Sequence, residues 1–81
     1  MNPNDIDNRL LRCFQGVFAN LDEQQIRESS QGATEPWDSL ASIMLARTIE
    51  EEFGIEVDLF SLDQLASFEA ARAFVAERVS V

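Results

Sequence analysis

The stretch EPWDSLASIMLARTIEEEFGIEV, from Glu35 to Val57, predicts the central element of the fold. Asp38 stands directly before a run with helical periodicity, where a carboxylate can accept hydrogen bonds from the free N–H groups of a first turn. Gly54 follows the last periodic residue, and glycine favours the left-handed conformation that ends many helices. We therefore predict a helix from Ser39 to Phe53.

The apolar residues of this helix fall on two of its sides. One row has the i, i+3, i+4, i+7, i+11 spacing of a core-facing stripe; it consists of Ser42, Leu45, Ala46, Ile49 and Phe53. A second row, rotated away from the first, begins apolar and ends charged; it consists of Leu40, Ile43, Met44, Arg47, Glu50 and Glu51. Single apolar residues are normal on a surface, but several adjacent ones rimmed by charge indicate a binding patch.

Two further helices are predicted from apolar spacing. A first helix from about Asn4 to Phe18, capped by Asn4 or Asp5, is indicated by the row Ile6, Leu10, Phe14 and Val17. A last helix, capped by Ser67, is indicated by the row Phe68, Ala71, Phe74 or Val75, and Val79.

The segments between these helices are more polar. From Asn20 to Pro36, Ser, Gln, Gly, Thr and Pro cluster, which predicts a long loop held to the core by Leu21 and Ile26. Between the second and last helices, Ser61 can cap one short turn that runs through Leu65. The expected fold class is all-α, a small bundle of three main helices plus one short helix.

Composition limits the size of the core. The 81 residues form a single domain, 1–81, and a domain of this size buries only about 60% of the surface of its unfolded chain, so a large internal active site is excluded. The longest apolar runs fall short of the roughly 18 residues of a membrane span. The first residues lack a basic region followed by an apolar run, so we expect a cytoplasmic location.

The charge balance predicts the kind of partner. The formal net charge is −9, with six Arg, no Lys and no His. Such a surface repels phosphate backbones and anionic lipids, which disfavours binding to nucleic acids and membranes. Proteins with basic patches are the expected partners.

The residue types also argue against an enzyme and against a metal site. Without His, Lys or Tyr the chain lacks the commonest general acids and bases. The single cysteine, Cys13, excludes an internal disulfide and lies on the apolar side of the first helix, where we expect it to be buried. The acidic groups, Asp22–Glu23, Glu50–Glu52 and Asp58, lack the alternating ligands and central Gly of a calcium loop.

Ser39 is the candidate functional residue. If Asp38 caps the helix, the Ser39 hydroxyl is free beside its positive end, where an attached anionic group is favoured by roughly 0.3–1 kcal/mol. No base in the chain is expected to activate this hydroxyl, so Ser39 suits the substrate of another enzyme better than a nucleophile. The alternative is that Ser39 is itself an ordinary N-cap.

With DSL at Asp38–Leu40 and a helix that ends in IEEEFGIEV, the chain resembles the acyl and peptidyl carrier proteins over most of its length. The resemblance implies a monomeric carrier bundle in which Ser39, next to Asp38, receives the phosphopantetheine arm of coenzyme A. The terminal thiol of that arm would hold an acyl or aminoacyl group as a thioester. The protein would therefore carry intermediates without catalysing a reaction.

The resemblance also implies a set of partners and a docking surface. The partners would be a phosphopantetheinyl transferase, a loading enzyme (a ligase, adenylation enzyme or acyltransferase) and a downstream synthase or transferase. Leu40, Ile43 and Met44 would dock in an apolar mouth of these enzymes, while Glu50 and Glu51 meet their Arg and Lys residues.

Two residues depart from the pattern of the family. Trp37 stands where carriers often have a small residue, and it either packs on the loop or broadens the contact surface. Arg47 stands where fatty-acid carriers usually have an apolar residue; it either pairs with Glu50 or Glu51 or excludes wrong partners by its charge.

These departures, with the absence of lysine, favour a freestanding carrier of a dedicated pathway, such as polyketide or nonribosomal peptide antibiotic biosynthesis, over the carrier of primary fatty-acid synthesis. Two alternatives from other classes are a carrier-like interaction module that is not modified, and a small carboxylate enzyme. The enzyme would need paired acids in a cleft, whereas the acids here are spread along the helices.

Overall fold

The computed structural model describes residues 2–34 and 37–79. Their secondary structure consists of four α-helices and one 3₁₀ helix, with isolated bridges but no strand. In chain order these are α1 (Pro3–Val17), α2 (Glu23–Arg27), α3 (Ser39–Phe53), η1 (Leu59–Leu65) and α4 (Phe68–Val79). The all-α prediction is confirmed at this level, as a small, mostly helical globule. Within the described ranges, every helix is too short or too polar to span a bilayer.

Helix α1 begins earlier than predicted. Its N-cap is Asn2, whose side chain accepts a hydrogen bond of 2.9 Å from the N–H of Asp5. The prediction that Asn4 or Asp5 caps the helix is wrong, because Pro3 starts it: proline lacks the N–H that would otherwise be unpaired in a first turn, and its fixed φ suits a helix.

Helix α2 was not predicted and lies inside the segment expected to be a loop. Asp22 and Gln25 form a reciprocal cap, in which the Asp22 carboxylate accepts from the Gln25 N–H and the Gln25 side chain accepts from the Asp22 N–H. Ile26 is fully buried, as expected, and Leu21 is partly buried against the core. Residues 35–36, the end of the predicted loop, lie outside the described residues.

Helix α3 has the predicted bounds. The Asp38 side chain accepts from the Ala41 N–H at 2.8 Å, and Gly54 ends the helix with φ of 66°, in the left-handed region. After an extended linker, η1 is capped by Asp58, whose carboxylate accepts from the N–H and hydroxyl of Ser61. The prediction that Ser61 is the cap is therefore wrong, whereas Ser67 caps α4 as predicted, accepting from the Ala70 N–H at 3.0 Å.

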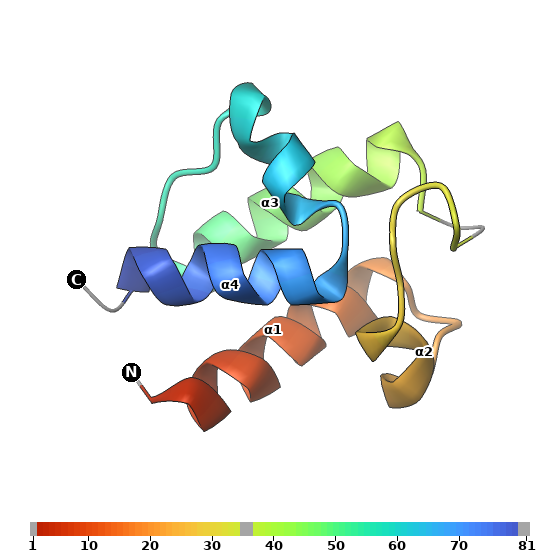
Figure 1. Cartoon of the computed structure of the whole chain (residues 1–81), viewed down its shortest axis with the longest axis horizontal. Coiled ribbons are helices and arrows are strands. Elements are labelled where there is room, and N and C mark those ends of the chain that lie inside the picture. Colours follow the sequence, from red (N-terminus) through yellow and green to blue (C-terminus); the bar gives the residue numbers. More distant parts are fainter. Residues whose placement is uncertain (1, 35–36, 80–81) are drawn as a thin grey trace.

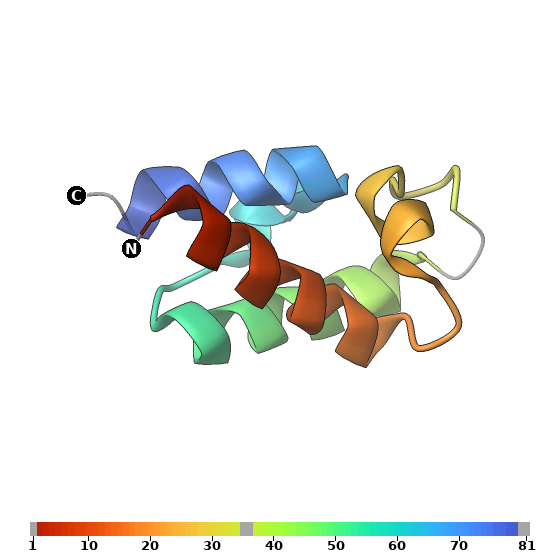
Figure 2. The same ribbon diagram turned by 90° about the horizontal axis from the view of Figure 1, so that it is seen from below.

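The helices surround one core. Helix α1 packs against α2, α3 and α4, and η1 packs against both α3 and α4 (Figure 1). Seen from below, α1 crosses the face formed by α3 and α4, while α2 lies beside one end of the molecule (Figure 2). The largest fully buried side chains come from every part of this arrangement: Leu10, Phe14, Ile26, Trp37, Leu45, Ile49, Leu65 and Val75.

Ion pairs join the helices at the edge of this core. Arg9 of α1 contacts Glu52 of α3, with 2.9 Å to the carboxylate and 3.0 Å to the carbonyl oxygen. Arg27 of α2 forms a bidentate pair with Asp7 of α1, at 2.7 and 2.9 Å, and this pair lowers the pKa of the Asp7 carboxyl. These contacts orient α2 and the end of α3 on α1.

Candidate functional site

The start of α3 leaves the Ser39 hydroxyl free of a capping role. The N-cap is Asp38, and Ser39 is the first residue of the helix, with an exposed side chain. The alternative in which Ser39 is itself the cap is therefore wrong. A hydroxyl in this position lies beside the positive end of a helix of fifteen residues.

Ser39 differs in exposure from the other serines of the described chain. Ser29, Ser42 and Ser61 are buried, and each takes part in a side-chain hydrogen bond. Ser30 and Ser67 are partly buried. Among the described serines, Ser39 alone is exposed, so it is the one most open to another enzyme.

Trp37 anchors the chain where it enters α3. Its side chain is only 1% exposed, and its indole N–H donates a hydrogen bond of 2.8 Å to the Ser42 hydroxyl. The indole packs edge-on against Phe14, with ring centroids 5.4 Å apart, and lies 5.3 Å from the ring of Phe18. Trp37 therefore packs, but in the core against Phe14 and Phe18 and not on the loop as predicted, and the assignment of Trp37 to a partner-binding surface is wrong.

The two rows of apolar residues on α3 separate as predicted. In the core-facing row Leu45 and Ile49 are fully buried, Ser42 and Ala46 are buried, and Phe53 is partly buried. In the other row the exposed fractions are 65% for Leu40, 41% for Ile43 and 50% for Met44. These three residues, called here the apolar patch, begin one position after Ser39.

The charged end of the second row is less uniform than predicted. Glu51 and Arg47 are exposed, and among the described residues no ion pair joins Arg47 to Glu50 or Glu51, so the predicted surface pair does not form. Glu50 is only partly exposed because its carboxylate accepts a hydrogen bond of 2.9 Å from the N–H of Val57 in the linker to η1. Glu50 therefore has a structural role that the spacing did not reveal.

Three further acidic residues and the cysteine have structural explanations. Asp22 and Asp58 cap helices, and Glu52 pairs with Arg9. The described chain holds no group of three or more His, Cys, Asp or Glu side chains that could bind a metal ion. Cys13 is buried as predicted, and burial raises the pKa of its thiol to about 11, so the thiol stays protonated at neutral pH.

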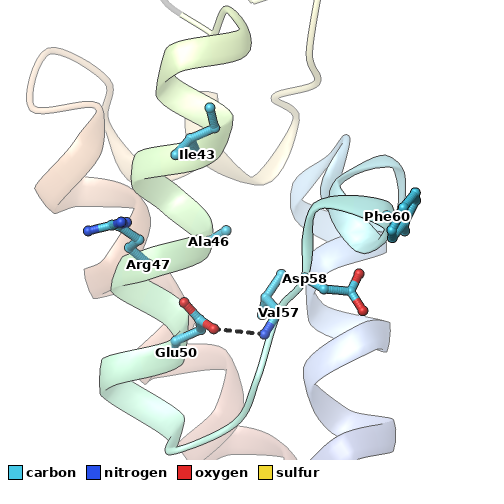
Figure 3. A pocket seen from close by; sticks show the side chains of 7 residues that line it. All are labelled: Ile43, Ala46, Arg47, Glu50, Val57, Asp58 and Phe60. Carbon is cyan, nitrogen blue, oxygen red and sulfur yellow. Dashed lines mark hydrogen bonds between the residues drawn. The ribbon is translucent and has the colours of Figure 1, made fainter.

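A groove lies beside the apolar patch, between α3 and the linker with η1 (Figure 3). It has a volume of about 480 Å³ and is lined by Ile43, Ala46, Arg47, Glu50, Val57, Asp58 and Phe60. Phe60, which is 93% exposed, was not among the residues predicted to form the binding surface. Its exposure could have been found from the spacing of Leu62 and Leu65, because residues three apart share one face of a 3₁₀ helix and Phe60 falls outside that row.

Comparison of the chain with protein-family models, with curated proteins and with solved structures finds no match. The site is thus characterised by its own geometry: a free serine hydroxyl at a helix N-terminus, a buried anchor before it and exposed apolar residues after it.

Proposed function

We propose that this protein is a carrier that holds acyl or aminoacyl intermediates on a phosphopantetheine arm attached to Ser39. The observation that carries the proposal is that two different residues, Asp38 and Ser39, provide the cap and the free hydroxyl at the start of α3. Asp38 supplies the cap, which frees the exposed Ser39 hydroxyl for modification. The resemblance of the segment from Asp38 to Val57 to carrier proteins supplies the identity of the group.

The residues around Ser39 fit such a group. The arm would be joined to the Ser39 oxygen through a phosphodiester, whose negative charge is favoured beside the first turn of α3. Its terminal thiol would supply the thioester chemistry. The chain itself has no His, Lys or Tyr to remove the serine proton, so this base belongs to the transferase that modifies Ser39.

Attachment at Ser39 would join a mobile group to a well-fixed part of the fold. The segment before Ser39 is fixed because Trp37, two residues earlier, is buried among aromatic rings and hydrogen-bonded to Ser42 within α3. Within residues 2–34 and 37–79, the Ser39 hydroxyl has no hydrogen-bond partner that it would have to leave. Cargo could therefore change its position without any change in the fold.

The apolar patch would bind the enzymes that load and unload the arm. Leu40, Ile43 and Met44 offer apolar area next to Ser39, and exposed Glu51 would steer enzymes with basic surfaces toward it. Reversible contact of this kind suits a protein that visits a transferase, a loading enzyme and a synthase in turn.

Arg47 favours a dedicated pathway over primary fatty-acid synthesis. Its guanidinium is exposed beside the apolar patch and is directed away from η1 (Figure 3). A partner built for an apolar residue at this position would have to bury an unpaired charge, which is costly. We propose a cytoplasmic, monomeric carrier of polyketide or nonribosomal peptide biosynthesis.

The experiment is to incubate the purified protein with coenzyme A and a broad-specificity phosphopantetheinyl transferase and to measure its mass. The intact protein should gain the mass of one phosphopantetheine group, and peptide mapping should place it on Ser39. The Ser39→Ala variant, with the cap at Asp38 intact, should fold and gain no mass. A wild-type protein that gains no mass would support the unmodified interaction module instead.

A further inference from the structure

The segment that follows α2 is bound to the start of α4. The Gln31 N–H donates a hydrogen bond of 2.7 Å to the carbonyl oxygen of Ala66, and the Phe68 N–H donates one of 3.3 Å to the carbonyl oxygen of Ser29. An isolated antiparallel bridge lies between these two bonds. Backbone pairing in both directions fixes the register of the two segments. Residues 29–34, called here the strap, are therefore held at the junction of η1 and α4.

Thr34 closes the strap with three hydrogen bonds. Its hydroxyl accepts from the Ser30 N–H at 3.0 Å, and its own N–H donates to the Ser30 carbonyl oxygen at 2.9 Å. Its carbonyl oxygen accepts from the Trp37 N–H at 2.9 Å. Gly32 lies within this turn with φ of 89°, in the left-handed region that glycine adopts without strain. The turn is thus bonded directly to the residue two positions before Ser39.

The anchor of the strap and Trp37 pack on the same aromatic ring. Phe68, which is bonded to the strap, and Trp37 both lie edge-on to Phe14, with ring centroids 5.0 and 5.4 Å apart. Among the described residues the Ser39 hydroxyl has no hydrogen-bond partner, so its place depends on the backbone on either side of it. On one side this backbone is α3, and on the other it is Trp37, held by the strap.

We propose that the strap positions Ser39 for its modification, with Thr34 and Gly32 as positioning residues that act through Trp37. This inference rests on the proposed carrier function. In the transfer, the Ser39 oxygen forms a bond to the phosphorus that bears the pantetheine arm, the bond between the two phosphates of coenzyme A breaks, and the adenosine bisphosphate half leaves with the electron pair. The serine proton passes to a base of the transferase. Such an attack tolerates little displacement of the nucleophile, since a shift of about 1 Å can cost about a hundredfold in rate.

The first test changes one group of Thr34. Thr34→Val replaces the hydroxyl by a methyl group, which cannot accept from the Ser30 N–H and needs more room than the present 3.0 Å, so the turn must open. With saturating coenzyme A and the broad-specificity transferase, kcat should fall about tenfold. KM for the protein should stay within about twofold, because the apolar patch is unchanged. Thr34→Ser keeps the acceptor and should restore the wild-type kcat.

Gly32→Ala and Gly54→Ala form a matched pair for the second test. Both glycines have positive φ, 89° and 66°, and an added Cβ would meet no atom within 4 Å at either place. Each substitution therefore strains the backbone without creating a clash. Gly32→Ala should lower kcat, whereas Gly54→Ala, at the far end of α3, should lower stability and leave kcat unchanged. Equal losses of kcat in the two variants would show that the rate follows overall stability, and would overturn the inference.

Trp37 also provides a local readout, because it is the single tryptophan of the chain. Thr34→Val and Gly32→Ala should make its fluorescence easier to quench with acrylamide, and Gly54→Ala should not. A fall in kcat with unchanged quenching would overturn the inference, because the strap would then act on the transferase directly and not through Trp37.

The outcomes separate this inference from the proposed function. Modification of both Thr34→Val and Gly32→Ala at the wild-type kcat would overturn the inference and leave the carrier function standing. If Gly32→Ala does not fold, the comparison of Thr34→Val with Thr34→Ser decides alone. No modification of the wild-type protein would overturn both proposals.

Discussion

The hydrogen bond between Trp37 and Ser42 provides a sharp test of how α3 is held, because the same substitution can be made one turn earlier as a control. Ser42→Ala removes the acceptor and leaves the buried indole N–H unpaired. An unpaired buried donor costs about 1–3 kcal/mol. The higher helix propensity of Ala offsets about 0.5 kcal/mol of this cost.

We therefore expect Ser42→Ala to lower the free energy of unfolding by about 1–2 kcal/mol, which for a domain of this size corresponds to a fall in Tm of roughly 5–15 °C. Ser39→Ala is the matched control, since Ser39 is exposed on the same helix and Asp38 supplies the cap. This control should change stability by no more than about 0.5 kcal/mol. Both values can be measured by urea denaturation followed by circular dichroism.

A third variant tests the assigned donor. In the Ser42→Ala background, Trp37→Phe removes the unpaired N–H, so this second change should cost less than the same Trp37→Phe change in the wild-type protein. Equal costs in both backgrounds would show that the indole and the hydroxyl are not coupled. Equal destabilisation by Ser39→Ala and Ser42→Ala would contradict the assignment of Asp38 as the cap, and with it the free hydroxyl on which the proposed function rests.

Three further changes test other parts of the molecule. Leu45→Asp should unfold the domain, because an unpaired buried carboxylate costs several kcal/mol against a total stability of about 5 kcal/mol. Ile43→Asp should leave Tm nearly unchanged, because Ile43 is exposed. Unfolding by both changes would refute the assignment of a buried and an exposed side to α3. Asp7→Asn should lower stability by about 1 kcal/mol at neutral pH through the loss of the pair with Arg27. The folded state lowers the Asp7 pKa below 3.8, so the stabilisation by the ion pair is present above that pH and is lost as the pH falls through the folded-state pKa. Urea denaturation of the variant and the wild type should therefore give converging free energies of unfolding in acid. A difference that persists in acid would show that the charge is not its cause. Glu51→Lys should lower the association rate with the transferase and flatten its dependence on salt in stopped-flow measurements, because the exposed carboxylate steers a basic partner. An association rate that responds neither to the substitution nor to salt would show that Glu51 is only a solvated surface charge.

The bounds of α3 and its two sides could be predicted because their signals are local. The Asp38 cap, the Gly54 terminator and the two rows of apolar residues all lie within one helix, where spacing alone determines which side chains share a face. The free Ser39 hydroxyl followed from the same argument, since one cap residue satisfies the first turn.

The errors arose where two local signals compete. Asp22 and Gln25 have the three-residue separation of a reciprocal cap, but the Ser, Gln and Gly residues that follow made the segment resemble a loop. In η1, both Asp58 and Ser61 have side chains that can cap a turn. Asp58 is the cap, and Ser61 instead donates its N–H and hydroxyl to the Asp58 carboxylate.

The roles of Trp37 and Glu50 could not be predicted because they depend on contacts between distant segments. Trp37 is buried by Phe14 of α1 and by Phe18 at the end of that helix, residues about twenty positions earlier in the chain. Glu50 faces the linker only because η1 folds back onto α3. No periodicity within α3 carries information on either contact.

The separation of the two sides of α3 would let one small domain combine stability with the docking proposed for the apolar patch. Its stability comes from Leu45 and Ile49 on one side and from caps at both ends of the helix. None of these groups belongs to the apolar patch, so contact with a partner need not disturb the core. The Trp37–Ser42 hydrogen bond lies at the junction, because it joins the buried side of α3 to the segment that positions Ser39. Loss of this bond should therefore lower stability and loosen the position of Ser39 together, whereas changes in the apolar patch should affect docking alone.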